Sequence, residues 1–311
     1  MHELESVELG GPPGGAVAVW RAVVRVLRSS ADDVSAVVFP SDCRVCDGPL
    51  TRLSRVPVCD GCLSLIVPQK FLLCDCCGEA VDMESVRFAA SEAAGRAPIF
   101  GGEMRERMCA PCRMVAPDFV KAVAFGVYEG ALREMVHLLK FERAEELAGP
   151  LGGKLAEAVE LMGAECPREM LVVAVPLFKK KGRERGLNQA VLLADSAVRV
   201  LNARGWKLMT AHGAMMRVRE TASQFALTPK QRRVNLRGAF EVRSEMVAGK
   251  DVLIVDDIYT TGATARECSR VMMRTGAKSV RVATLARAQR DVAVAWDGAV
   301  GEPGVRVGFG G

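Results

Sequence analysis

The stretch V-L-I-V-D-D-I-Y-T-T-G-A-T, residues 252–264, indicates an apolar strand that ends in two carboxylates, Asp256 and Asp257. A turn rich in threonine and glycine follows and leads into a helical pattern. Backbone N–H groups in such a turn, together with the N-terminus of the next helix, form a cradle for a phosphate dianion. The carboxylates one step earlier lie where they accept hydrogen bonds from sugar hydroxyls. The stretch therefore predicts a pocket for a ribose 5-phosphate.

Each part of this stretch also has a simpler interpretation. Paired aspartates at a strand end occur in magnesium-binding α/β domains, and turns favour glycine and small polar residues whatever they bind. The contiguous pattern is more specific, and it resembles the 5-phosphoribosyl-1-diphosphate (PRPP) signature of type I phosphoribosyltransferases. The resemblance implies that Asp256 and Asp257 hold the ribose hydroxyls. It implies that the following turn holds the 5-phosphate through Thr260, Thr261, Gly262, Ala263 and Thr264.

The chain has eleven cysteines, and the spacing of eight of them, in four C-x2-C pairs, indicates their role. Eight thiolates are the complement of two structural four-cysteine zinc sites. Adjacency assigns the first site to Cys43, Cys46, Cys59 and Cys62 and the second to Cys74, Cys77, Cys109 and Cys112. A cross-braced pairing would use the same eight residues, and iron–sulfur ligation is the competing chemistry. Of the remaining cysteines, Cys76 is a spare thiol within the module and Cys268 is expected in the core.

We expect the chain to be cytoplasmic. No apolar run approaches the roughly 20 residues needed to span a bilayer. The N-terminus carries Glu3, Glu5 and Glu8 and no basic start, which is unlike a secretory signal. The net charge of +5 permits contact with phosphates or nucleic acid without arguing for it.

The expected organisation has five parts. Residues 1–15 are expected to be disordered, and 16–39 to form an amphipathic helix. Residues 40–117 form the cysteine module, with 80–105 as an inserted loop. An α/β domain covers 118–288 and a tail covers 289–311.

Hydrophobic periodicity predicts alternating strands and helices in the α/β domain. Strands are expected at 120–128, 171–175, 252–255 and 279–285, and helices at 132–140, 151–162, 188–201 and after 264 to near 276. This alternation implies a mainly parallel sheet flanked by helices, with ligands at the carboxyl ends of the strands.

Two basic segments are expected near the pocket. The first follows the strand at 171–175 and offers cations suited to a diphosphate: Lys179, Lys180, Lys181, Arg183 and Arg185. The second, residues 217–240, is expected to be a mobile loop that closes over substrate. It includes Gln224, Lys230, Arg232 and Arg233. In the predicted helix at 132–140, His137 is interpreted as a structural or surface residue.

Taken in order, these motifs resemble the ComF family, which has an N-terminal double zinc ribbon and a type I phosphoribosyltransferase domain. The resemblance rests on the four C-x2-C pairs, Y-E-G-A-L-R-E-M-V-H-L-L-K-F at 128–141, V-P-L at 175–177, R-E-R-G-L-N-Q-A at 183–190, T-P-K-Q-R-R-V-N-L-R-G-A-F at 228–240 and the PRPP stretch. It covers residues 36–288 and implies a role in DNA uptake during natural transformation, with single-stranded DNA and the competence uptake machinery as partners.

Two functional hypotheses follow. In the first, the chain binds PRPP with Mg²⁺ bridging the diphosphate and the ribose hydroxyls, and transfers the phosphoribosyl group to an unnamed acceptor. In the second, the chain binds single-stranded DNA or senses PRPP without transfer. Aromatic stacking usually accompanies binding to single strands, and the candidates here are Phe178, Phe225 and Phe240.

Overall fold

The computed structural model describes residues 42–50, 55–81, 99–100, 103–104, 107–178, 187–220 and 229–289. Within these ranges the side chains of 99, 100, 103, 104, 229, 230, 232 and 233 are not described. The expected disordered segment 1–15, the helix at 16–39, most of the loop at 80–105 and the tail from 290 lie outside the described residues.

A five-stranded sheet with the order β3-β9-β8-β4-β5 organises the chain, and all of its neighbouring strands run parallel. The strands are β3 (Lys121–Val127), β4 (Glu169–Ala174), β5 (Lys207–Thr210), β8 (Asp251–Tyr259) and β9 (Ser279–Arg287). The continuous apolar run in β8 is buried because a parallel sheet is covered on both faces. The predicted mainly parallel sheet is confirmed, and β5 is a strand that the pattern did not predict.

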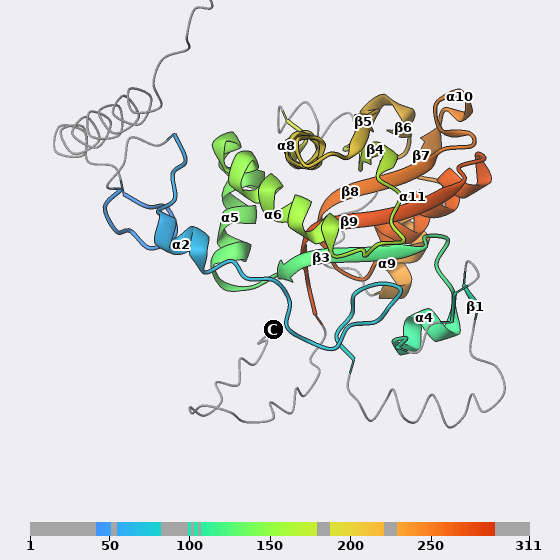
Figure 1. The fold of residues 1–311 in the computed structure, drawn as a ribbon, viewed down its shortest axis with the longest axis horizontal. Coiled ribbons are helices and arrows are strands. Elements are labelled where there is room, and N and C mark those ends of the chain that lie inside the picture. Colours follow the sequence, from blue (N-terminus) through green and yellow to red (C-terminus); the bar gives the residue numbers. More distant parts are fainter. Residues whose placement is uncertain are drawn as a thin grey trace, which may run out of the picture.

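Helices cover both faces of this sheet (Figure 1). On one face lie α5 (Gly130–Phe141), α6 (Ala148–Glu160) and α8 (Gln189–Ala203). The other face carries α11 (Ala263–Arg274), with α9 (Pro229–Leu236) packed against it and α10 (Ser244–Val247) nearby. The N-terminus of α8 is fixed by Asn188, whose side-chain oxygen accepts a hydrogen bond from the N–H of Ala190 at 3.1 Å.

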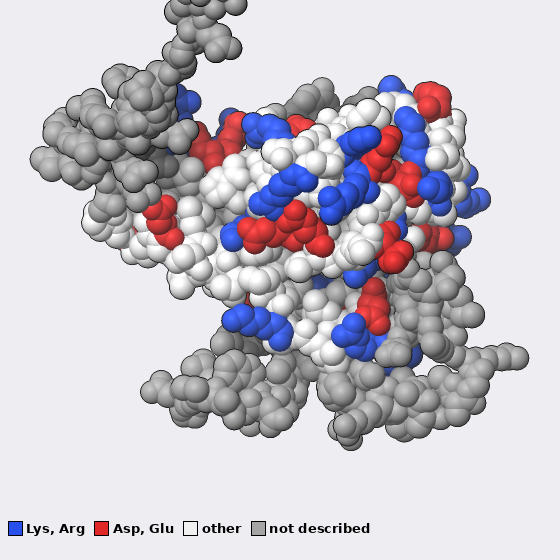
Figure 2. All heavy atoms as spheres, viewed as in Figure 1, with Lys and Arg blue, Asp and Glu red and all other residues white. Residues whose placement is uncertain are grey.

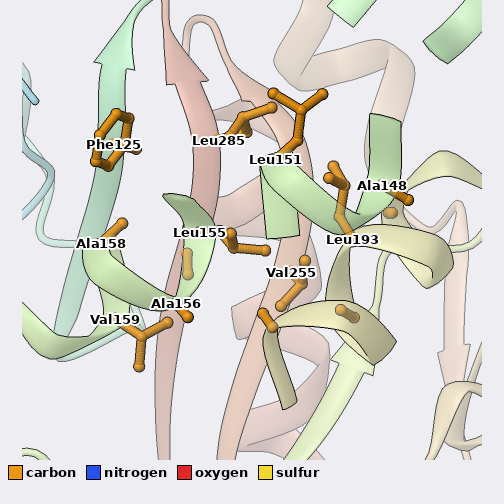
Figure 3. Packing of buried hydrophobic residues seen from close by; sticks show 14 of the residues in the cluster. Phe125, Ala148, Leu151, Leu155, Ala156, Ala158, Val159, Leu193, Val255 and Leu285 are labelled. Carbon is orange, nitrogen blue, oxygen red and sulfur yellow. The ribbon is translucent and has the colours of Figure 1, made fainter. Parts of the chain in front are cut away.

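Alternate residues of β8 enter two different cores, as the twofold period of a strand requires. Leu253 and Val255 pack under α6 and α8, where Figure 3 shows Leu155 and Leu193 directed toward the sheet. Val252 and Ile254 pack on the opposite face, against α11. The central strands of the sheet are therefore buried between two layers, whereas the edge strand β5 is largely exposed.

The segment 217–240 differs from the expected loop. A short antiparallel pair flanks it, formed by β6 (Met215–Arg217) and β7 (Phe240–Val242), and α9 occupies 229–236. The segment was expected to be a mobile loop, but residues 229–236 within it form a helix, and its closure over substrate stays a prediction. In the part of the segment that is described, Arg219 donates to the carbonyls of Asn235 and Arg237, each at 2.8 Å.

Both cysteine-rich parts pack on the α/β domain. The first contains α2 (Asp60–Ser64) and lies beside α5 in Figure 1, and Cys43 and Cys62 belong to the core under α5 and α6. The second contains α4 (Ala110–Met114) and the small pair β1 (Ile99–Phe100) and β2 (Glu103–Met104). Its cysteines share the core of the opposite face.

Candidate functional site

The candidate site lies where neighbouring strands continue in opposite directions along the sheet. From β4 the chain passes through α8 outward to β5, whereas from β8 it passes through α11 to β9 on the other side. Such a switch point opens a crevice beyond the carboxyl ends of the strands. Pairing between β4 and β8 ends at Ala174 and Val255, and β8 then continues beside β9 alone as far as Tyr259. Asp256 is the first residue past this point.

A small pocket that opens to solvent occupies the crevice. Among the predicted residues, Asp256, Thr260, Gly262 and Thr264 line it. The pocket also includes residues that the sequence did not indicate, from β8, from β9, from the residue after β4 and from α11: Val175, Ile254, Ile258, Tyr259, Ala265, Val282 and Thr284.

The turn between β8 and α11 brings backbone N–H groups to this pocket. Gly262 adopts a left-handed conformation, with φ of 75°, and caps α11. The first N–H groups of a helix have no intrahelical partner, so this end favours an anion. Among the described residues, the buried Oγ1 of Thr261 has no hydrogen-bond partner. The turn therefore offers unsatisfied donors that fit a phosphate.

The two aspartates have different surroundings although they are neighbours. An Asp256 carboxylate oxygen accepts a hydrogen bond from the N–H of Asp257 at 2.9 Å. The Asp257 carboxylate pairs with the ammonium of Lys140 at 2.8 Å, and both side chains are less than a fifth exposed. Lys140 lies on α5, and no sequence pattern had linked it to the acid pair.

Asp256 holds its proton unusually well. Burial and the adjacent Asp257 charge raise the pKa of Asp256 to about 7, against the opposing influence of Lys140, the Asp257 N–H and Arg217. Arg217 comes from the end of β6, so one cation of the second basic segment does lie near the acids. When this carboxyl group loses its proton, both of its oxygens can accept hydrogen bonds from a ligand.

The other residues predicted to contact the ligand belong to segments or side chains that the structure does not describe. Lys179, Lys180, Lys181, Arg183, Arg185 and Gln224 lie outside the described residues, and the side chains of Lys230, Arg232 and Arg233 on α9 are not described. The flanks of the first basic segment are described, and the Asn188 side chain donates to the carbonyl of Val175 at 3.0 Å. This segment therefore leaves and rejoins the described fold at the pocket's edge.

Two groups of four thiols lie apart from the pocket. Each group combines two C-x2-C pairs that follow one another in the sequence. The first quartet is Cys43, Cys46, Cys59 and Cys62, and the second quartet is Cys74, Cys77, Cys109 and Cys112. All four sulfurs of each group lie within 4.8 Å of one another. A tetrahedral ion with zinc–sulfur bonds of about 2.3 Å places its ligands about 3.8 Å apart. Cys43 and Cys62 are separated by 3.8 Å and Cys77 and Cys109 by 3.6 Å, so the quartets fit single tetrahedral ions.

Backbone N–H groups support the thiolate form of these ligands. The N–H of Cys59 donates to the sulfur of Cys43 at 3.3 Å, and the N–H of Cys109 donates to that of Cys74 at 3.3 Å. Burial opposes ionisation of Cys43, but backbone N–H groups, led by that of Cys59, lower its pKa to about 6. Each quartet can therefore hold a cation such as zinc. Of the other cysteines, Cys76, Cys166 and Cys268 are buried.

Comparison with known proteins identifies related chains. Residues 187–299 match the family model described as a phosphoribosyl transferase domain. The DNA utilization protein YhgH of Salmonella typhi is 31% identical over 253 residues, which cover 81% of this chain and 99% of that protein. Competence protein F of Haemophilus influenzae is 27% identical, over 80% of this chain and 98% of that protein. Competence protein ComFC of Bacillus subtilis is 26% identical, over 51% of this chain and 61% of that protein. In the described part of the chain, no helix has the length and apolar character needed to cross a membrane.

Proposed function

The chain belongs to the ComF family, and we propose that it binds PRPP with Mg²⁺ as part of a role in DNA uptake or use. The observation that carries the ligand proposal is that Asp256 and the capping turn of α11 line one pocket at the switch point of a phosphoribosyltransferase sheet. A carboxylate pair beside an anion cradle matches a sugar that carries a phosphate. The names of the relatives support the DNA role.

In the proposed complex, Asp256 and Asp257 accept hydrogen bonds from the ribose hydroxyls. Thr260, Thr261, Gly262, Ala263 and Thr264 surround the 5-phosphate with N–H and hydroxyl donors. Mg²⁺, a hard cation that prefers oxygen ligands, would neutralise part of the charge of the diphosphate. The cations at 179–185 would balance the remaining charge. Lys140 fixes Asp257 in place before the ligand arrives.

We also propose that the two cysteine quartets hold structural zinc. Each offers four sulfurs at tetrahedral spacing and no open position for substrate. Neither quartet contributes a residue to the pocket lining. The metal would therefore stabilise the fold and take no part in chemistry at the sugar.

Isothermal titration with PRPP and Mg²⁺ tests the ligand. The wild type is expected to bind, and an Asp256→Asn/Asp257→Asn double variant to bind at least ~100-fold more weakly, because two charge-assisted hydrogen-bond sites are lost. Asp251→Asn is the matched control: it lies at the other end of β8, where its carboxylate pairs with Lys278 and Ser279. No heat for the wild type would refute the ligand proposal, and equal weakening by Asp251→Asn would refute the assignment of the acids.

A diphosphate-release assay separates transfer from binding without transfer. If the protein is a transferase, one of a panel of nucleobases releases diphosphate with the wild type and not with the double variant. If it acts by binding DNA, single-stranded DNA binds with strong salt dependence and independently of both acids. Figure 2 shows basic and acidic side chains of the described residues interleaved on the face in view.

A further inference from the structure

The two cysteine quartets differ in how deeply they enter the fold. In the first quartet Cys46 is exposed and Cys59 is half-buried. Every thiol of the second quartet is buried, and its members share one hydrophobic core with β8 and α11. The second quartet is thus built into the same face of the sheet as the pocket, whereas the first lies against α5 and α6.

Two arginines from the α/β domain contact the sulfurs of the second quartet. Arg266, in the first turn of α11, places a guanidinium nitrogen 3.5 Å from the sulfur of Cys112 and donates to the carbonyl of Val115 at 2.7 Å. Arg287, at the end of β9, places a nitrogen 3.6 Å from the sulfur of Cys77 and also pairs with Glu79. Among the described residues, the sulfurs of the first quartet have no such arginine contact.

These contacts have a simple electrostatic reason. A divalent ion with four thiolates carries a net charge of about −2, and burying that charge is costly unless cations balance it. Two guanidinium groups offset part of this charge and remain charged in the interior, and Arg287 also pairs with the buried Glu79. The second centre therefore requires arginines that the cysteine module itself does not provide.

The same two arginines lie next to the phosphate turn. The backbone N–H of Arg266 donates to the carbonyl of Gly262 at 2.9 Å as an ordinary helical hydrogen bond of the first turn of α11. The guanidinium contacts of Arg266 with Cys112 and Val115 therefore anchor the end of the helix that continues into the turn. The guanidinium of Arg287 lies 4.1 Å from the centre of the Tyr259 ring. Tyr259 in turn covers Gly262 so closely that a Cβ there would lie 2.6 Å from its Cζ and nearer still to its hydroxyl. Two short chains of contacts thus connect the sulfurs to the turn, one from each side.

We propose that the metal centre of the second quartet positions the phosphate turn, through Arg266 on one side and Arg287 with Tyr259 on the other, so that ligand affinity depends on this metal and not on the first. The proposal rests on the proposed function, because it concerns the pocket assigned to PRPP. These three are positioning residues. When the second metal is lost, the four thiolates take up protons, the negative charge that attracts both arginines disappears, and the turn loosens.

Hydrogen exchange of residues 259–266 is the readout, since it reports the turn whether or not a ligand binds. Arg266→Met is expected to increase exchange there and to weaken the binding of PRPP and of ribose 5-phosphate by about 10-fold or more, the loss that one charge-assisted contact produces. Arg270→Met is the matched control. It lies one turn further along α11, pairs with Glu267 and leaves the second quartet untouched. Equal exchange in the two variants would overturn the proposal.

The metal arm uses the full-length chain. A Cys46→Ser/Cys59→Ser variant is expected to lose one zinc and keep the exchange of residues 259–266 unchanged. Removal of both zinc ions by a chelator is expected to increase that exchange while circular dichroism still reports a folded sheet. Unchanged exchange after both ions leave, or increased exchange in the first-quartet variant, would overturn the coupling. A wild type that fails to bind PRPP refutes the proposed function alone, because the exchange measurements still decide the coupling.

Discussion

At the scale of single residues, the informative contrast is between Asp256 and Asp257. They are adjacent, yet Asp257 is paired with Lys140, whereas Asp256 is half-buried and its pKa is raised to about 7. A carboxyl whose pKa is raised on folding keeps its proton in the folded state at pH values where the unfolded chain has lost it. Between about pH 4 and pH 7 the unfolded state therefore binds fewer protons, and the free energy of unfolding falls as the pH rises.

The raised pKa of Asp256 predicts how the stability of the ligand-free protein changes with pH. In denaturant titrations from pH 5.5 to 7.5, Asp256→Asn is expected to gain stability over the wild type as pH rises, by up to ~1.4 kcal/mol per pH unit inside the window. Asp257→Asn serves as the second arm: it removes the like charge, so the window should move to lower pH. Parallel pH profiles for the wild type and Asp256→Asn would show that Asp256 ionises normally.

At the scale of elements, the turn from β8 into α11 places a strict steric and conformational requirement on one residue. Gly262 combines a φ of 75° with the close cover of Tyr259. Gly262→Ala is expected to destabilise the protein by ~2–4 kcal/mol, because it adds a clash to the ~1 kcal/mol cost of a left-handed alanine. Gly249→Ala is the control, since Gly249 has a φ of 72° and open space around its Cα. Urea unfolding of the two variants measures the difference, and equal losses would mean that Tyr259 moves aside freely.

The same elements show how much the sequence could predict. The residues of β8, α11 and β9 carry long periodic signals, and their strands and helix were expected within a few residues. By contrast, β5 has a single buried side chain, and β6 and β7 have three residues each, too few to show a period. The strongly polar α9 has no apolar stripe that would separate it from a loop. The pair between Lys140 and Asp257 was not predictable, because it joins elements that only the strand order brings together.

At the scale of the whole molecule, the cysteine quartets join the N-terminal part to both cores. The spacing of the C-x2-C pairs predicted the eight thiols but not that the second quartet would share a core with the sheet. Metal analysis is expected to return two zinc ions per chain. Their removal by a chelator at neutral pH should lower the thermal midpoint by at least ~10 °C, reversibly on adding zinc back, because the free energy of zinc binding is part of the free energy of folding. Iron, or a single zinc per chain, would contradict this prediction.

The position of β9 has a consequence for how the chain is assembled during translation. β9 is the last strand of the described chain, yet it lies between β3 and β8, and Lys121 on β3 waits for a partner, Arg281, about 160 residues further along. Arg287 then reaches back 210 positions to Cys77. Until β9 leaves the ribosome, the edges of β3 and β8 that β9 will join have no partner, and the second quartet lacks its contact with Arg287. Completion of the sheet, of this metal centre and of the pocket therefore awaits the same late segment of the chain.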